Sequence, residues 1–262
     1  MRLLPRTISS VGVALATLPL ALGALATPGL TPQAIAAQGQ TALASPQPLP
    51  TAQINGVVWD QTIVGNVVYV VGEFDQARPA GSPDKQNESP RSNAMAYDIT
   101  TGEMLDWAPQ LNAAANAIEA SPDGSTLYIG GKFTSVNGQP ASHLAAVDTA
   151  GQYKPLNGGT PGGAVSPNGT VRDLELSPDG STLYMAGLFT QVNDLERLRA
   201  AALDLKTQQV TSFAPRVDDE SEVRTITVAA DGSAIAIGGS FKTVEGSSDA
   251  YGMAILEKDG AL

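Results

Sequence analysis

The chain has 262 residues, with 15 basic and 26 acidic side chains, a net charge of −11 and no cysteine. The acidic balance argues against nucleic acid and anionic membranes as partners, because both require clustered Lys and Arg. The lack of cysteine excludes disulfides, thiol catalysis and a lipid-modified N-terminal cysteine. With only one histidine as well, we expect no zinc or copper site of the usual kind and no cofactor.

The N-terminal residues 1–37 have the pattern of a secretory signal peptide. Two arginines precede an apolar run of 16 residues from Val11 to Ala26, and small residues follow up to Ala37. The alternative is an uncleaved membrane anchor, but the run is shorter than the roughly 20 residues that span a bilayer. We therefore expect a secreted or extracellular protein, with an envelope-associated form as the alternative and no membrane span after cleavage.

The mature chain begins with residues 38–53, which are rich in Ala, Gln, Pro and Ser and are expected to form a flexible leader. Removing residues 1–37 takes away two arginines and no acidic residue, so the mature net charge is −13. We interpret this charge as a means of solubility outside the cell.

A short pattern then recurs four times: a β-rich run, a glycine, one more residue and a phenylalanine. The phenylalanines are 59, 56 and 52 residues apart, and a period of this size is typical of propellers and solenoids. The repeated pairs are Gly72 and Phe74, Gly131 and Phe133, Gly187 and Phe189, and Gly239 and Phe241. A glycine inside a strand indicates a close backbone approach or a bulge, and the aromatic ring can fill the space between neighbouring blades. Ligand stacking by the rings is the alternative.

Other strand signals surround each glycine. Asp-Gly turns precede it at 121–124, 177–180 and 230–232, with Gly65 and Asn66 in the first repeat. A third strand follows each phenylalanine and ends in an acidic residue, for which we expect turn hydrogen bonding before metal ligation. These acidic residues include Asp98, Asp148 and Asp204.

Fourth strands are indicated at 104–109 and 210–215, which gives four short antiparallel strands per 50–60 residues. The predicted fold is all-β, a β-propeller-like array of about four four-stranded antiparallel blades. The expected units are residues 54–109, 110–160, 161–216 and 217–262, the last of them truncated.

The phrase from Leu127 to Gly138, followed by Leu144–Asp148, resembles the delta-60 repeat. That repeat occurs in secreted bacterial β-propellers, often in actinobacterial surface proteins that carry PKD modules. The resemblance extends from about Asn55 to the C-terminus and is strongest in the second and third units. It implies a propeller fold and an extracellular setting, and it supplies no catalytic residues.

The fourth unit stops where its last strand should begin. Closure of a propeller removes exposed sheet edges. We therefore expect an incomplete ring or a piece of a longer protein. A small ring closed by a strand near residues 52–58 is the alternative.

Catalytic and metal-binding patterns are weak. His143 has no nucleophile elbow to accompany it and is interpreted as a loop residue. The acidic loop residues Asp218, Asp219 and Glu220 are weak calcium candidates, because the regular spacing of an EF-hand is absent and a solvated loop is the simpler interpretation.

Two long loops are candidate recognition surfaces, because long loops on a rigid scaffold often carry binding. The first is Asp75–Ser92 and the second is Asn157–Thr170, with tolerated insertions as the alternative for both. The first loop offers five candidate binding residues: Arg78, Asp84, Lys85, Asn87 and Arg91.

Export, the repeats and the lack of catalytic groups favour a non-enzymatic binding or adhesion module for an extracellular protein or glycan. The first alternative is a hydrolase or lyase that acts on polysaccharide through carboxylates at the propeller centre. The second alternative is a purely structural segment of a larger surface protein.

Overall fold

The computed structural model describes residues 50–157, 164–218 and 221–262. The predicted signal peptide and most of the predicted leader lie outside these ranges. The described residues form strands, turns and one 3-10 helix, η1 (Ser248–Ala250). None of the helices in these ranges is long and apolar enough to cross a membrane.

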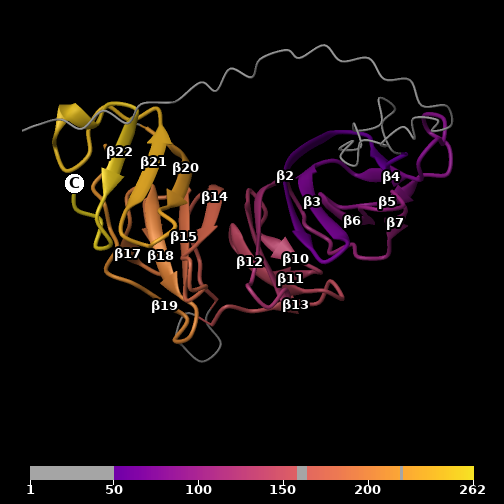
Figure 1. Ribbon diagram of the computed structural model, residues 1–262, viewed down its shortest axis with the longest axis horizontal. Helices are drawn as coiled ribbons and strands as arrows, with labels where there is room; N and C mark the ends of the chain where they lie inside the picture. Colours follow the sequence, from indigo (N-terminus) through magenta and orange to yellow (C-terminus); the bar gives the residue numbers. More distant parts are fainter. Residues whose placement is uncertain (1–49, 158–163, 219–220) are drawn as a thin grey trace, which may run out of the picture. The chain divides into compact units, whose positions relative to one another are not determined.

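Four antiparallel sheets, here named I to IV, follow one another along the chain (Figure 1). Sheet I contains β2 (Val57–Val64), β3 (Val67–Glu73), β6 (Ala94–Asp98) and β7 (Met104–Leu105). Sheet II contains β8 (Ala115–Ala120), β9 (Thr126–Gly131), β12 (Leu144–Asp148) and β13 (Tyr153–Lys154). Sheet III contains β14 (Val171–Leu176), β15 (Thr182–Gly187), β18 (Ala200–Asp204) and β19 (Gln209–Val210). Sheet IV contains β20 (Val223–Val228), β21 (Ile235–Gly239) and β22 (Met253–Leu256).

Shorter strands lie outside the four sheets. They are β1 (Gln53–Ile54), β4 (Gln76–Arg78), β5 (Ser89–Pro90), β10 (Ser135–Val136), β11 (Gln139–Pro140), β16 (Gln191–Val192) and β17 (Leu195–Glu196). The pairs β10–β11 and β16–β17 are hairpins that follow a repeat phenylalanine, and β1, β4 and β5 pair in the first repeat.

In sheets I to III the second strand is an apolar run, because it lies between neighbouring strands of its own sheet and is covered on both faces. In β9 and β15 the five residues after the first threonine are all buried. Continuous apolar runs, as opposed to alternation, are expected for strands covered on both faces.

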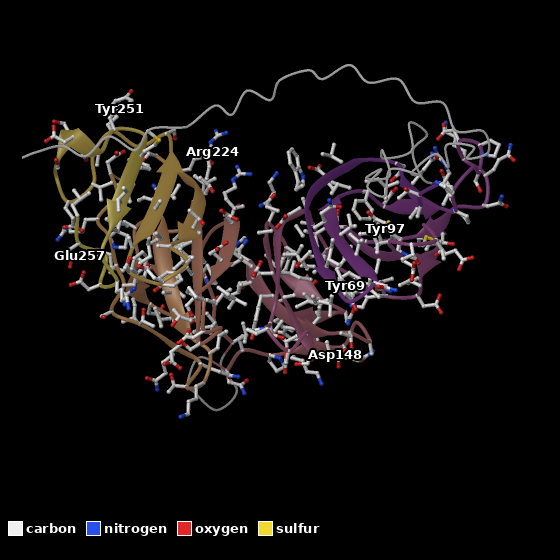
Figure 2. The ribbon with its side chains drawn as sticks, viewed as in Figure 1. Tyr69, Tyr97, Asp148, Arg224, Tyr251 and Glu257 are labelled. Atoms are coloured by element: carbon white, nitrogen blue, oxygen red, sulfur yellow. The ribbon has the colours of Figure 1, made fainter. Side chains whose placement is uncertain are left out.

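The core consists of layers between successive sheets. Tyr69 of sheet I packs with Ile118 and Ile129 of sheet II, and the same kind of layer joins II to III and III to IV. Tyr69, which Figure 2 labels, also meets the ring of Trp107 edge to face, and the ring centroids are 4.9 Å apart. The four repeat phenylalanines are buried within or beside these layers.

The predicted all-β array of antiparallel sheets is confirmed, and sheet IV has three strands among the described residues. The acidic residues that end the third strands serve as turn acceptors, as expected: Asp98 accepts from the N–H of Thr100, and Asp148 from that of Gln152. The proposed limits of the four units stay predictions.

Candidate binding site at the inner-strand bulges

The first strand of each sheet contains one β-bulge, at which its register against the second strand shifts by one residue. The bulge residues are Trp59, Asn116, Arg172 and Arg224. The strands β2, β8, β14 and β20 pack as successive neighbours. The four bulge residues, together with Glu222, line one pocket of about 340 Å³, here named the bulge site.

The repeated glycine explains why each bulge forms. A Cβ atom added to Gly72 would lie 2.0 Å from the backbone oxygen of Val57, and one added to Gly187 would lie 2.1 Å from that of Thr170. The glycine therefore lets the first strand approach closely just before its extra residue, which the bulge turns out of the ladder. The repeated glycine of the sequence therefore determines where the bulge site forms.

Trp59 provides the aromatic surface of the bulge site. Its side chain is 56% exposed, although large aromatic residues are usually buried. An exposed indole offers a flat apolar face with an N–H donor at its edge. Trp107, the other tryptophan of the chain, is buried and donates its Nε1–H to the backbone oxygen of Asp148 at 3.1 Å.

Charges at the bulge site are organised around Glu222, which is buried. Its carboxylate pairs with Arg172 at 3.4 Å and with Arg224. The Arg224 side chain remains 69% exposed, and Figure 2 shows it at the upper end of β20. Two guanidinium groups pair with one carboxylate, which leaves N–H donors of the exposed Arg224 for an anionic or hydroxylated ligand.

Asn116 joins two sheets as well as lining the pocket. Its Nδ2 donates to the backbone oxygen of Val171 in β14 at 2.8 Å. The side chain is therefore held in one orientation, and a fixed amide is a suitable hydrogen-bonding group for a ligand.

A row of carboxylates lies one and three residues beyond the bulges on the inner strands. Burial raises the pKa of Asp60, Asp173 and Glu175. Burial, and then the negative charges of Glu175, Asp60 and Asp173, raise the pKa of Glu119 to about 7. A carboxyl group that holds its proton near neutral pH can act as an acid, and perturbed groups of this kind are typical of functional sites. Within the described ranges no three acidic or histidine side chains are grouped so as to hold a metal ion.

Three of the five predicted binding residues of the loop Asp75–Ser92 make contacts within the protein. Arg78 is mostly buried and pairs with Asp84 at 3.0 Å and with Glu88 at 3.7 Å. Arg91 donates to the backbone oxygen of Leu105 at 3.2 Å. The Arg78 pairs lie within the loop, and the Arg91 contact holds the loop against β7 of sheet I. The binding role of the loop stays a prediction.

Two other residues of that loop occupy turns. Lys85 and Asn87 have positive φ angles of 59° and 56°, and Asn87 is 3.4 Å from the hydroxyl of Ser82. The role of Arg91 recurs in the third repeat, where Arg197 donates to the backbone oxygen of Thr211 at 2.6 Å. A contact that recurs in two repeats indicates a structural function.

Of the three calcium candidates, Asp219 and Glu220 lie outside the described residues. Asp218 accepts hydrogen bonds from the backbone N–H groups of Lys242 and Thr243 at 2.6 and 3.0 Å. Asn112 makes the same pair of contacts in the second repeat and Asn168 in the third. Asp218 is therefore at a repeat position that binds backbone.

His143 is at a repeat position as well. Its φ is 64° and its Nδ1 lies 3.1 Å from the backbone oxygen of Gly131. Asn93 and Arg199 occupy the same left-handed turn in the first and third repeats, with φ angles of 65° and 70°. The second candidate loop, Asn157–Thr170, is described only in part, because residues 158–163 lie outside the described ranges.

Sequence reasoning missed the bulge residues, because they are a tryptophan, an asparagine and two arginines and share no single residue type. Their signal is positional: each lies 17 residues before the phenylalanine in the last three repeats and 15 before it in the first. The signal becomes readable only when the repeats are aligned on the phenylalanine and the shift in register is known.

The sequence pattern of the Rax2 C-terminal beta propeller domain matches residues 94–240, more than half of the chain. The matched range runs from β6 to β21 and includes three of the four bulge residues. No curated protein matches the sequence.

Proposed function

The chain belongs to the family of the Rax2 C-terminal beta propeller domain, and we propose that it is a binding module whose ligand is a glycan containing uronic acid. The observation that carries the proposal is the bulge site, where an exposed tryptophan lies beside an asparagine and two arginines. The apolar face of a sugar ring stacks on an indole, and guanidinium groups bind carboxylates through two parallel hydrogen bonds.

The setting is part of the same proposal. The pattern of residues 1–37 supports export, and the resemblance to the delta-60 repeat supports an extracellular, bacterial surface-associated scaffold. A glycan is the ligand class that such a protein meets there.

The test is a calorimetric titration of the chain with an oligogalacturonate and with a neutral oligosaccharide of the same length. We expect the acidic glycan to bind and the neutral one to bind at least about tenfold more weakly, because only the acidic one engages the arginines. Trp59→Ala and Arg224→Ala should each weaken binding of the acidic glycan at least about tenfold.

Matched controls exist for both variants. Tyr251→Ala removes an exposed aromatic residue outside the bulge site, and Lys132→Ala removes an exposed positive charge outside it. Both controls should bind as the native chain does. Equal affinity in the Trp59 and Arg224 variants, or no binding of either glycan, would overturn the proposal.

A second candidate function rests on Glu119. Glycosidases require one carboxylic acid with a raised pKa and a second carboxylate nearby. Glu119, with its pKa of about 7, and Glu175, which acts on it by charge, are candidates for these roles. Release of reducing ends from the same oligogalacturonate, abolished by Glu119→Gln, would support a hydrolase. Binding of the oligogalacturonate without release of reducing ends would exclude the hydrolase.

A further inference from the structure

The bulge site has an uncharged half and a charged half. Its uncharged residues, Trp59 and Asn116, belong to β2 and β8 of sheets I and II. Its charged residues lie in or just before β14 and β20, the first strands of sheets III and IV: Arg172, Glu222 and Arg224. A pocket of about 340 Å³ is at the small end of the range for ligand sites, roughly 300–1,000 Å³. One short stretch of glycan therefore contacts both halves.

In the uncharged half, the amide of Asn116 leaves an acceptor for the ligand. Its Nδ2 donates to the backbone oxygen of Val171 at 2.8 Å, and a carbonyl oxygen there can be matched only by the nitrogen of the amide. The orientation of the amide is therefore fixed by its partner. None of the described residues donates to Oδ1 of Asn116. A hydroxyl or amide N–H of a ligand can donate to this oxygen, whereas a carboxylate cannot and is repelled by it.

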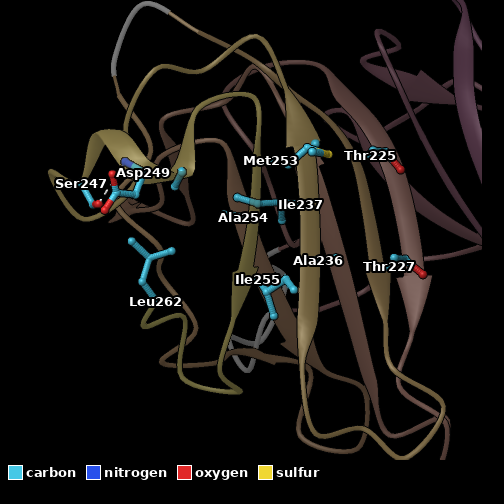
Figure 3. Close-up of a pocket in the computed structure, with 12 residues that line it drawn as sticks. Thr225, Thr227, Ala236, Ile237, Ser247, Asp249, Met253, Ala254, Ile255 and Leu262 are labelled. Atoms are coloured by element: carbon cyan, nitrogen blue, oxygen red, sulfur yellow. Dashed lines mark hydrogen bonds between the residues drawn. The ribbon is translucent and has the colours of Figure 1, made fainter.

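The residues that follow the first and last bulge residues differ in charge in the same sense. Trp59 is followed by Asp60, whereas Arg224 is followed by Thr225, which occupies the equivalent position on β20 and is labelled in Figure 3. A ligand carboxylate beside Trp59 would meet the carboxylate of Asp60. Beside Arg224 it would meet a guanidinium group and, on the next residue, a hydroxyl.

The carboxylates of the charged half have partners within the protein. Glu222 pairs with Arg172 at 3.4 Å and with Arg224, and Asp173 accepts from the backbone N–H of Ile226 at 2.8 Å. The Arg224 side chain is still 69% exposed, so N–H donors of its guanidinium group remain for a carboxylate of the ligand.

We propose that the glycan bound at the bulge site alternates a uronate with an uncharged sugar, the uronate lying at Arg224 and the uncharged sugar at Asn116 and Trp59. The inference rests on the function proposed above and specifies the pattern of its ligand. Successive uronates would place one carboxylate against Oδ1 of Asn116 and beside Asp60. The site thus favours one charge pattern by attraction at one end and by repulsion at the other.

The test compares four digalacturonates that differ only in charge: the diacid, the two methyl monoesters and the diester. Titrations followed by NMR on the indole N–H of Trp59 give a Kd for each. One monoester should bind at least about fivefold more tightly than the diacid, because the ester removes the carboxylate from the Asn116 end. The diester should bind at least about tenfold more weakly than this monoester, because it offers no carboxylate to Arg224.

A variant of Asn116 tests the cause of the preference. Asn116→Arg suits the bulge, because Arg172 and Arg224 occupy the equivalent positions of sheets III and IV. It replaces the acceptor with donors, so the diacid should then bind at least as tightly as either monoester. Gln139→Arg adds the same charge at an exposed residue of β11 outside the bulge site and should keep the native preference.

The outcomes separate this inference from the proposed function. If the native chain binds the diacid as tightly as the better monoester, or if Asn116→Arg keeps the preference for the monoester, the alternating pattern is overturned and the proposed function stands. Binding of a longer oligogalacturonate without binding of any disaccharide would overturn the pattern as well. No binding of the disaccharides or the longer oligogalacturonate, or equal binding of the diester, would overturn the proposed function itself.

Discussion

The carboxylate of Asp173 in β14 accepts a hydrogen bond on Oδ2 from the backbone N–H of Ile226 in β20, at 2.8 Å. Asp60 in β2 makes the same contact with the N–H of Ile118 in β8, also at 2.8 Å. Both aspartates directly follow a bulge residue. The bulge residue therefore points into the pocket, and the aspartate after it forms a hydrogen bond with the neighbouring sheet.

Replacing Asp173 with alanine should lower the free energy of unfolding by about 1–3 kcal/mol, because the N–H of buried Ile226 loses its acceptor. Urea unfolding of the native chain and Asp173→Ala checks this. Asp106→Ala, at an exposed aspartate, is the control and should change little. Equal stability of the native chain and Asp173→Ala would show that the contact between sheets contributes nothing.

The pKa of Glu119 predicts a loss of stability with rising pH. Because the folded-state pKa of about 7 is above the ordinary 4.5, the folded chain binds more protons than the unfolded one between these values. Stability from this group is present below pH 4.5 and falls as the pH rises to about 7.

Glu119→Gln should therefore raise the melting temperature at pH 8 and change it little at pH 4.5. Thermal melts at the two pH values measure the difference, and Glu103→Gln, at an exposed glutamate, is the control. The same shift at both pH values would contradict a raised pKa.

Much of the fold is readable in the sequence because the repeat is made of backbone requirements. The glycine at Gly187 is required by a carbonyl 2.1 Å from where its Cβ would lie, and Gly180 is required by a φ of 68° in its turn. The same close approaches and turns recur in every repeat, and each of them requires glycine at the same position of the repeat.

The bulge site is harder to predict from the sequence, because its residues meet no backbone requirement that recurs. A bulge residue such as Trp59 or Arg224 points out of the ladder and is free to vary, so no single residue type is shared by all four repeats. The loop Asp75–Ser92 is long and charged, but the charge of Arg78 is paired with the carboxylates of Asp84 and Glu88. Sequence shows which residues are charged and not which charges are already paired.

A matched pair of glycines tests the close approach that forms the bulge. A Cβ on Gly239 would lie 2.1 Å from the backbone oxygen of Glu222, whereas one on Gly238 would meet only the Thr225 methyl group, at 2.9 Å, and Gly252 O at 4.0 Å. Gly239→Ala should cost about 1–3 kcal/mol of stability and Gly238→Ala less than about 0.5. Sheet III already has Ala186 at the position of Gly238. Denaturant unfolding of both variants measures the two losses of stability. Equal losses would show that the close approach at Gly239 is not the reason for its glycine.

The Asp-Gly turns predict two unusually acidic carboxyl groups. Hydrogen bonds from Ser177, and then from Ser181, hold the pKa of Asp179 at about 2, and Ser121 and Ser125 do the same for Asp123. The stability from these groups is present above pH 3.8 and is lost as the pH falls towards 2. Carboxyl carbon-13 titration by NMR should give midpoints near 2 for both. Ser177→Ala should move the midpoint of Asp179 upward, while midpoints near 3.8 in the native chain would rule out these turn contacts in solution.

The most direct measurement follows the two tryptophan indole N–H signals by NMR while an oligogalacturonate is added. Trp59 lines the bulge site, and the Nε1–H of Trp107 is bound to Asp148 inside the protein. We expect a saturable shift of the Trp59 signal, assigned by its loss in Trp59→Phe, and no change in the Trp107 signal. If the acidic glycan binds and the Trp59 signal does not move, the bulge site is not where the ligand binds.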